Sequence, residues 1–274
     1  MVEIDWLNLD GAYADRESSI TVGVFDGLHL GHRTLIDRVV HSGWMPVVVT
    51  FQRHPSERLL HDDIPGYIMS LRQKRAMLRD MGVEVVVQVD FTEEFRSMPG
   101  VAFLRRLDSS FHIRRMVVGH DFRCGYELDT NTDTIGAYFA RRDVEVIPVD
   151  PRTVGGVAVS STLIRTRICE GELGTARELL GRPYVLDVTD EEIERDDQRL
   201  YIVKSPRGLL PESRQLVPPS GVYPAEFIGD RGAYRAELEI GENSLSWPLA
   251  VDESIRYIVP HQAGIESKEL SECP

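Results

Sequence analysis

The sequence predicts an α/β fold in which a doubly wound parallel sheet is followed by a second, small antiparallel β domain. Strand-like and helix-like segments alternate up to residue 184, which is typical of a parallel sheet with helices on both faces. Beyond residue 184 the apolar runs are short and are separated by turn residues, which is typical of antiparallel strands. The length of 274 residues exceeds the common size of one domain. We therefore expect two domains, residues 1–184 and residues 185–274.

The first domain is expected to alternate strands and helices along the chain. The apolar run at residues 45–51 predicts a strand that is buried on both faces. An amphipathic pattern closed by Gly82 predicts the second helix. Strands are expected at residues 19–25, 45–51, 83–89, 115–119 and 144–148, and helices at residues 35–40, 71–81, 101–109 and 134–142. Because ligands bind at the carboxyl ends of the strands in such sheets, functional residues are expected just after the strands.

The second domain has a different pattern. Residues 187–197 contain seven acidic residues and one arginine, and residues 209–219 are rich in proline and polar residues, so both stretches are interpreted as linkers or loops. Strands are expected at residues 200–203, 221–228, 233–240 and 255–259. These short strands predict a small antiparallel β-barrel or sandwich.

Composition and charge exclude several classes of protein. Hydrophobic residues make up 42% of the chain and charged residues 27%, the balance of a globular protein. No apolar stretch is long enough to span a bilayer, and acidic residues interrupt the first twenty positions, so neither a transmembrane helix nor a signal peptide is expected. The three cysteines form no C-x-x-C pair, which favours a reducing cytoplasm. The net charge of -13 argues against binding to nucleic acid or to a membrane surface. We expect a cytoplasmic protein that acts on small molecules, with a monomer as the default oligomeric state.

The strongest functional signal is the segment GVFDGLHLGH at residues 23–32. It joins the first predicted strand to the first predicted helix, where unpaired amides and the positive end of the helix dipole favour an anion. Its three glycines leave room for a nucleotide close to the backbone. His29 and His32 are three residues apart, so both imidazoles can point at one anion. The alternative is a pair of surface or capping histidines, but the position after a strand favours a binding site.

Two further segments follow predicted strands. His54 and Pro55 come after the second strand, where a ligand-facing side chain is expected, although a loop histidine fixed by its proline is the alternative. Asp121 and Phe122 follow the fourth strand, where a carboxylate and an aromatic ring can hold a ligand. Phe122 can equally belong to the core.

Polar residues also open two predicted helices. Asn131 and Thr132 supply short polar groups, and they can also cap the helix that follows. Residues 160–162 read Ser-Ser-Thr, which is itself a capping sequence. Arg165, one turn later, can add a guanidinium group against a phosphate.

These segments carry a family resemblance. Residues 23–32 resemble the H-x-G-H signature of the nucleotidyltransferases with a Rossmann-like fold, and their longer pattern is similar to the bacterial bifunctional riboflavin kinase/FMN adenylyltransferases, also called FAD synthetases. Further matches follow in the family's order: TFQRHPSE at residues 50–57, GHDFRCG at 119–125, SSTLIR at 160–165 and LGRPY at 180–184. The resemblance covers nearly all of residues 18–184.

The resemblance implies a Rossmann-like sheet of the H-x-G-H type and transfer of AMP from ATP to FMN, giving FAD and pyrophosphate. It implies that His29, His32 and Arg165 stabilise phosphate charge during the reaction. The implied ATP site comprises Gly23, Phe25, Asp26, Gly27, His29, His32, Ser160, Ser161, Thr162 and Arg165. The implied flavin site comprises His54, Pro55, Asp121, Phe122, Asn131 and Thr132. Mg²⁺ is expected to accompany ATP, and the sequence identifies no protein ligand for it.

The chain departs from the family pattern in both domains. Arg53, His120 and Cys124 stand where the family usually has a proline, an acidic residue and a phenylalanine. The family's kinase module would show a glycine-rich loop ending in Pro-Thr-Ala-Asn, and neither occurs after residue 184. We therefore expect residues 185–274 to be a shortened, kinase-deficient version of that β-barrel.

Three alternatives to this function stay open. The same fold can transfer a nucleotide to another phosphate acceptor, such as phosphopantetheine, nicotinamide mononucleotide or a sugar phosphate. The chain can be a flavin- or nucleotide-binding protein without turnover, or a bifunctional enzyme with an unrecognised kinase site. Pyrophosphate release on mixing with ATP and FMN separates an enzyme from a binding protein.

Overall fold

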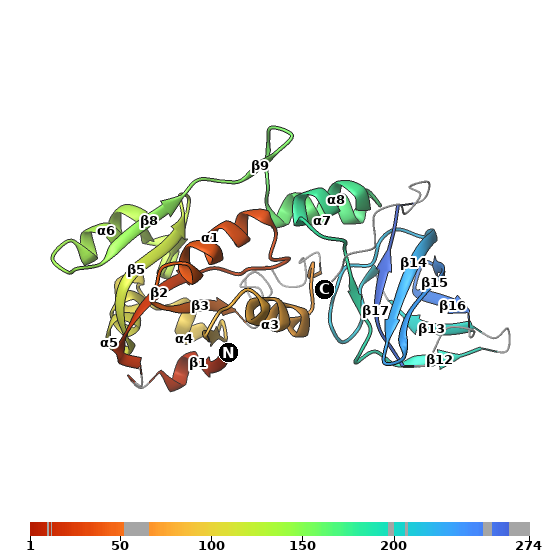
Figure 1. Cartoon of the computed structure of the whole chain (residues 1–274), viewed down its shortest axis with the longest axis horizontal. Coiled ribbons are helices and arrows are strands. Elements are labelled where there is room, and N and C mark those ends of the chain that lie inside the picture. Colours follow the sequence, from red (N-terminus) through yellow and green to blue (C-terminus); the bar gives the residue numbers. More distant parts are fainter. Residues whose placement is uncertain are drawn as a thin grey trace. The chain divides into compact units, whose positions relative to one another are not determined.

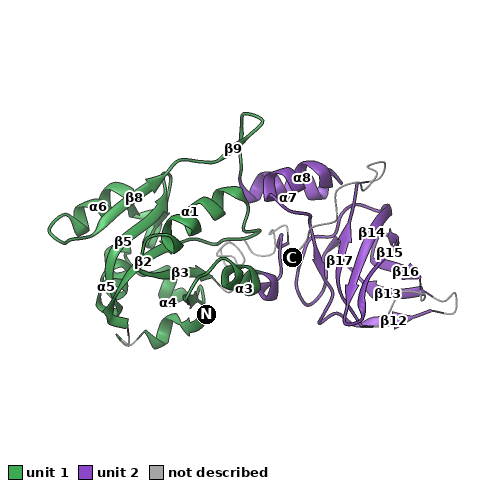
Figure 2. Ribbon diagram, viewed as in Figure 1, with its two compact units in different colours: residues 1–64, 74–159 green, residues 65–73, 160–274 purple. Residues whose placement is uncertain are grey.

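A computed structural model describes residues 1–9, 11, 13–51, 66–196, 200–205, 208–248 and 254–262 (Figure 1). The chain divides into two compact units, residues 1–64 with 74–159 and residues 65–73 with 160–274 (Figure 2). The second unit therefore includes two helices that precede residue 184. The functional boundary expected at residue 184 stays a prediction.

Six parallel strands form the sheet of the first unit, in the order β1-β4-β3-β2-β5-β8. They are β1 (Val2–Asp5), β2 (Tyr13–Val22), β3 (Met45–Phe51), β4 (Val85–Val89), β5 (Phe111–Gly119) and β8 (Glu145–Val149). All five expected strands are present. The edge strand β1 was not predicted because its four residues, VEID, form no apolar run.

Helices cover both faces of this sheet, which confirms the doubly wound α/β fold. They are α1 (Leu30–Val40), α3 (Leu71–Asp80), α4 (Glu93–Arg96), α5 (Gly100–Ser110) and α6 (Thr132–Phe139). Apolar residues of α5 and α6 share one core with alternate strand residues such as Val49 and Val118. On the opposite face, Val39 of α1 packs with Val117 of β5. Figure 1 shows these layers.

The strand order places a topological switch point beside β2. The chain passes from β2 to β3 and β4 on one side of it, and β5 and β8 lie on its other side. Loops that leave neighbouring strands in opposite directions open a crevice at the carboxyl ends of the strands. The segment at residues 23–32 follows β2, and residues 120–125 follow β5, so both leave the sheet at this crevice.

The second unit contains α7 (Ser161–Cys169), α8 (Leu173–Leu180) and a curled antiparallel sheet of seven strands. The strand order is β11-β17-β14-β15-β16-β13-β12. The strands are β11 (Leu186–Asp187), β12 (Ile193–Arg195), β13 (Leu200–Lys204), β14 (Gly221–Gly229), β15 (Gly232–Ile240), β16 (Ser244–Pro248) and β17 (Ile255–Pro260). The expected antiparallel β domain is confirmed, and three of its strands, β11, β12 and β16, were not predicted.

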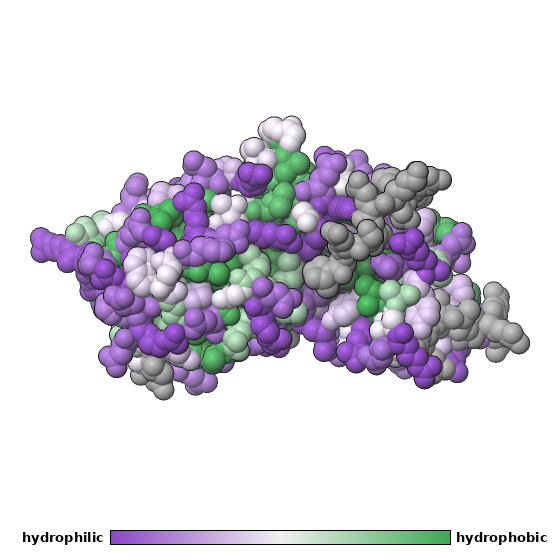
Figure 3. Space-filling model, in the orientation of Figure 1, coloured by the Kyte–Doolittle hydropathy of each residue, from purple (hydrophilic) through white to green (hydrophobic). Residues whose placement is uncertain are grey.

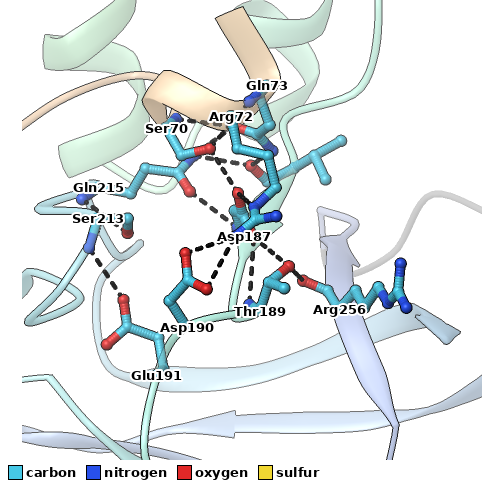
Figure 4. Close-up of polar contacts among 11 residues, drawn as sticks. Ser70, Arg72, Gln73, Asp187, Thr189, Asp190, Glu191, Ser213, Gln215 and Arg256 are labelled. Carbon is cyan, nitrogen blue, oxygen red and sulfur yellow. Dashed lines mark hydrogen bonds and ion pairs between the residues drawn. The ribbon is translucent and has the colours of Figure 1, made fainter. Parts of the chain in front are cut away.

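The charge of residues 187–197 indicated a linker or loop, but residues 187–196 belong to the folded β domain, with Asp187 in β11 and residues 193–195 in β12. Asp187 is only 5% exposed, and its carboxylate accepts hydrogen bonds from the Ser70 hydroxyl and from the Thr189 hydroxyl, the latter at 2.6 Å (Figure 4). Glu191 is also buried and accepts from the backbone amides of Glu212 and Ser213. Ser70, Glu212 and Ser213 are far in sequence from the carboxylates that they contact, so a count of charges could not reveal them.

A buried glutamine completes this polar network. Gln215 is fully buried, and its side-chain amide donates to the carbonyls of Ile68 at 3.1 Å and Val185 at 2.9 Å. Its side-chain oxygen accepts from the backbone amide of Asp187 at 2.8 Å. The network therefore joins residues 66–73 to the β-sheet of the second unit (Figure 4).

Hydrophilic residues cover most of the face drawn in Figure 3, with apolar residues in small patches between them. None of the helices in the described parts of the chain is long and apolar enough to cross a membrane.

Candidate active site

The turn after β2 has an unusual backbone. Phe25 and Leu28 have positive φ angles of 52° and 37°, and Gly27 between them has 83°. Both non-glycine side chains are fully buried, so packing holds a conformation that residues with a Cβ rarely adopt. The Phe25 ring lies over Gly23, where an added Cβ would come within 3.0 Å of the ring. A side chain at position 23 would therefore push against the Phe25 ring.

This turn brings His29 and His32 together. His29 caps the N-terminus of α1, and its Nδ1 accepts a hydrogen bond from the backbone amide of His32 at 3.3 Å. The two rings stack with their centroids 3.6 Å apart and their planes at 18°, and the Phe25 ring contacts His32 edge-on at 5.2 Å. Because Nδ1 of His29 accepts, the proton of its neutral ring is on Nε2.

A buried lysine lies behind the turn. Lys74 is 7% exposed, and its ammonium group donates to the carbonyls of Val24 at 3.0 Å and Phe51 at 3.2 Å. The Thr50 hydroxyl also donates to the Val24 carbonyl, at 3.0 Å. Desolvation lowers the pKa of Lys74 to about 8, against the opposing effect of the Asp26 charge, and the charge of Arg75 lowers it further.

Sequence analysis assigned no role to Lys74. Two signals could have found it: the whole chain has only three lysines, and Lys74 is four residues from the buried Leu78 on the same face of α3. A lysine on the apolar face of a helix is costly to bury, so it needs acceptors nearby.

An apolar pocket of about 340 Å³ opens beside the same turn. It is lined by segments that follow four neighbouring strands. The lining residues are Val22, Gly23, Val24, Phe51, Phe91, Phe95, Arg96, Met98, Phe103, Phe122, Arg123, Cys124, Gly125 and Leu128. Five of these are phenylalanines, which favours a flat, apolar ligand with few polar groups.

The expected flavin residues lie in different surroundings. Phe122 lines the pocket and also packs against the core, so both of its expected environments are observed. Asp121 is exposed, and its Oδ1 lies 3.8 Å from Nδ1 of His120. His54 and Pro55 are outside the described residues.

Asn131 and Thr132 lie at the start of α6. The Asn131 side chain accepts from the backbone amide of Thr134 at 3.0 Å, which confirms the capping interpretation, and Thr132 is the first residue of the helix. A short hairpin of β6 (Arg123–Cys124) and β7 (Thr130–Asn131) pairs Asn131 with Arg123 of the pocket lining. Asn131 is therefore next to the pocket without being part of its lining.

Cys124 contributes a neutral thiol to the pocket wall. Desolvation and the charge of Asp129 raise the pKa of Cys124 to about 12. The thiol is therefore protonated at neutral pH, and it behaves as a small apolar group rather than as a nucleophile.

The remaining expected ATP residues belong to the second unit. Ser160 caps α7, and its hydroxyl accepts from the backbone amide of Leu163 at 3.2 Å, so the capping interpretation is confirmed. Ser161 and Thr162 form the first turn of that helix. Arg165 is buried, and its Nε donates to the carbonyl of Gly66 at 3.3 Å. A role of these residues toward ATP stays a prediction.

The expected metal was tested against the side chains. Within the described ranges, no three His, Cys, Asp or Glu side chains gather in a way that could hold a metal ion. Asp26 is buried in the turn, close enough to influence the charge of Lys74.

Comparison with known proteins identifies relatives of the chain. A family model described as FAD synthetase matches residues 12–163. A bifunctional riboflavin kinase/FMN adenylyltransferase of Listeria monocytogenes is 29% identical over 238 residues, covering 84% of this chain and 74% of the relative. A protein of the same description from Escherichia coli K12 is 28% identical over 215 residues, covering 77% and 68%.

A solved structure supports the fold. The crystal structure of a macrolide-efflux protein from Streptococcus pneumoniae has a TM-score of 0.79 at 23% identity. It covers 95% of this chain and 90% of that chain. At this level of identity the similarity concerns the arrangement of strands and helices, and not the activity.

Proposed function

The chain belongs to the FAD synthetase family, and from this premise we propose that it transfers the adenylyl group of ATP to FMN, giving FAD and pyrophosphate. The family resemblance of the sequence motifs is confirmed, and the chain is a nucleotidyltransferase enzyme. The choice of FMN as acceptor is supported by the aromatic pocket, whose lining includes Gly23 and Val24. These two residues directly precede residues 25–29, which we call the histidine turn.

The pocket is the proposed site of the flavin ring system. Its phenylalanines offer flat apolar contacts to a tricyclic ring, and its volume falls in the usual range for small-molecule sites, about 300–1,000 Å³. Phe122 is the proposed ring contact. Five further contacts of the flavin are proposed from the family resemblance alone: Asp121, Asn131, Thr132, His54 and Pro55.

The stacked histidines are the proposed contacts of the ATP phosphates. The turn from Gly23 to Gly27 leads into the N-terminus of α1, where backbone amides and the helix dipole favour negative charge. Nε2 of His29 donates to a phosphate oxygen, and His32 adds a second imidazole. Arg165 is a proposed third contact, and Ser160, Ser161 and Thr162 are proposed contacts of ATP.

The proposed chemistry needs no nucleophile from the protein. An oxygen of the FMN phosphate attacks the α-phosphorus of ATP and forms the new P–O bond, while the bond from that phosphorus to the bridging oxygen breaks. The bridging oxygen keeps the electron pair and leaves as pyrophosphate. Because the second pKa of a phosphate monoester is about 6, the attacking oxygen is already ionised at neutral pH. The chain contributes alignment of the two phosphates and stabilisation of negative charge.

Mg²⁺ is proposed to arrive with the ATP phosphates. Mg²⁺ commonly keeps water and phosphate oxygens as ligands and needs few protein groups. When bound, the ion would neutralise charge on the pyrophosphate that leaves.

We further propose that the chain lacks riboflavin kinase activity. The relatives in Listeria and Escherichia coli are described as bifunctional. The Pro-Thr-Ala-Asn sequence expected of the family's kinase module is absent from this chain, and an acidic stretch follows residue 184 instead. The second unit would then serve the protein in another way than by phosphorylating riboflavin.

One assay tests both proposals. The purified chain is mixed with ATP, MgCl₂ and either FMN or riboflavin, and the flavins are separated by chromatography. FAD and an equal amount of pyrophosphate are expected from FMN, and no product from riboflavin. FMN formed from riboflavin would overturn the kinase proposal, whereas binding of FMN without pyrophosphate would overturn the transferase proposal.

A further inference from the structure

We propose that Lys74 is a positioning residue that holds the wall of the aromatic pocket and the histidine turn in register. Its ammonium group donates to two carbonyls, that of Val24 just after β2 and that of Phe51 at the end of β3. Both of these residues line the pocket, and Val24 directly precedes Phe25, the first residue of the turn with a positive φ. One buried group therefore contacts both parts of the proposed site.

The two carbonyls lie where the strand ladder ends. The last backbone hydrogen bond between the end of β2 and β3 is donated by the Gly23 amide to the carbonyl of Val49, at 3.1 Å. Beyond it the ladder between β2 and β3 ends, and the partly buried carbonyls there need donors from elsewhere. Lys74 supplies a donor to the carbonyls of Val24 and Phe51, and Thr50 adds a second donor to Val24.

The turn next to these contacts depends on its surroundings. Phe25 and Leu28 adopt left-handed conformations that are unfavourable for their residue types and persist only when packing fixes them. His29 follows directly and caps α1. A loss of the contacts at Val24 would therefore free the turn that orients both imidazoles.

The charge of Lys74 is also set by this location. Among the described residues, the charged groups that act on it are Asp26 of the turn, which favours the ammonium form, and Arg75 of its own helix, which disfavours it. Burial is the largest effect, and it lowers the pKa of Lys74 to about 8. The ammonium form thus predominates at pH 7 and is lost between pH 8 and 9.

This inference rests on the proposed function, because register between two subsites matters only if two substrates react. The reaction needs the FMN phosphate in line with the α-phosphorus, and small errors in alignment cost much rate. Loss of Lys74 should therefore lower kcat more than it weakens the binding of either substrate. A residue that only supported the fold would change stability and both KM values together.

The test compares Lys74→Met with Lys204→Met in the full-length protein. Methionine keeps the length of the side chain and removes the donors and the charge. Lys204 is an exposed lysine of β13 paired with Glu194, so its replacement controls for the loss of a lysine. We expect kcat to fall about 10- to 100-fold in Lys74→Met with KM for ATP and FMN changed less than about threefold, and no change in Lys204→Met.

Two further variants protect the test against misfolding. Thr50→Val removes the second donor to the Val24 carbonyl, and a smaller fall in kcat in the same direction is expected. Lys74→Arg keeps donors and charge, and it should recover part of the rate. The wild-type kcat should decline above pH 8 as Lys74 loses its proton, and this decline should be absent in Lys74→Arg because the guanidinium stays charged.

Hydrogen exchange provides a readout that does not depend on activity. Amides of residues 23–32 should exchange faster in Lys74→Met than in wild type or Lys204→Met, while amides of β14 and β15 should be unchanged. If the wild type forms no FAD, the transferase proposal fails and the exchange data still report on the turn. An active Lys74→Met with wild-type kcat and unchanged exchange at residues 23–32 would overturn the role of Lys74.

Discussion

The imidazole rings of His29 and His32 stack with their centroids 3.6 Å apart, although one belongs to the helix cap and the other to the first turn. Gly31 lies between them in sequence, and a Cβ at this position would come within 3.1 Å of Cε1 of His29 and 3.2 Å of its Nδ1. A side chain at residue 31 would therefore press on the His29 ring of this stack.

Gly31→Ala should lower the rate of FAD formation without unfolding the protein. The new methyl group would press on the His29 ring and tilt it away from His32, so kcat should fall about tenfold or more. Initial rates at saturating ATP and FMN give kcat, and thermal unfolding gives stability. Gly136→Ala is the matched control, because a Cβ there meets nothing within 4 Å. This control substitution should raise the free energy of unfolding by about 0.5–1 kcal/mol.

His29→Asn should separate the capping role of this residue from its proposed catalytic role. Asparagine is a good N-cap, so the melting temperature should stay near that of the wild type, while kcat should fall about 100-fold through loss of a donor to phosphate. His29→Ala should show the same kinetic loss and lose about 1 kcal/mol of stability as well. An unchanged kcat in His29→Asn would exclude the imidazole from the reaction.

Phe122→Ala should weaken the binding of FMN and leave that of ATP unchanged. The ring lines the pocket, and loss of an aromatic contact of about 1–1.5 kcal/mol corresponds to roughly a tenfold rise in Kd. Quenching of flavin fluorescence measures Kd for FMN directly. Tyr126→Ala is the control, because Tyr126 is an exposed aromatic residue outside the pocket lining. Equal effects of the two variants would argue against a flavin in this pocket.

The stability of the wild type should rise relative to Lys74→Met as the pH is raised from 8 to about 10. The pKa of Lys74 is lowered from 10.5 to about 8 in the folded chain, so between these values the unfolded state binds more protons than the folded state. Stability increases with pH wherever this holds. Chemical denaturation at several pH values measures the difference, and a constant difference would mean that Lys74 is not titrating in this range.

Gln215→Met should destabilise the second unit. The amide of Gln215 satisfies the carbonyls of Ile68 and Val185 and the amide of Asp187, and methionine would leave these buried groups without their partner. A loss of about 2–4 kcal/mol in the free energy of unfolding is expected. Gln262→Met removes one contact, to the amide of Gly174, and should cost less. Similar costs for the two variants would contradict the importance of the buried network.

Elements with a strong internal pattern could be predicted from the sequence. The apolar run at residues 45–51 is β3 with unchanged bounds, and the amphipathic pattern that ends at Gly82 is α3. The edge strand β1 was missed because VEID mixes acidic and apolar residues. Its pairing with β4 is parallel and joins segments about eighty residues apart, so no local signal announces it.

The candidate site was predictable only where residues are close in sequence. The segment at residues 23–32 showed both histidines and their place before a helix. It did not show that phenylalanines from positions 51 to 122 gather beside it, because these come from separate strands, helices and loops. Lys74 was missed for the same reason, since its acceptors are backbone carbonyls, and every residue type offers one.

The hydrogen bonds to two carbonyls in the wall of the aromatic pocket have a consequence for inhibitors. Two residues of its wall, Val24 and Phe51, have carbonyls that already accept from the Lys74 ammonium group. A compound entering the pocket would thus be selected by shape and ring contacts more than by hydrogen bonds to these two positions. Given the flavin site proposed for this pocket, rigid tricyclic compounds are the natural starting point for a chemical probe of this enzyme.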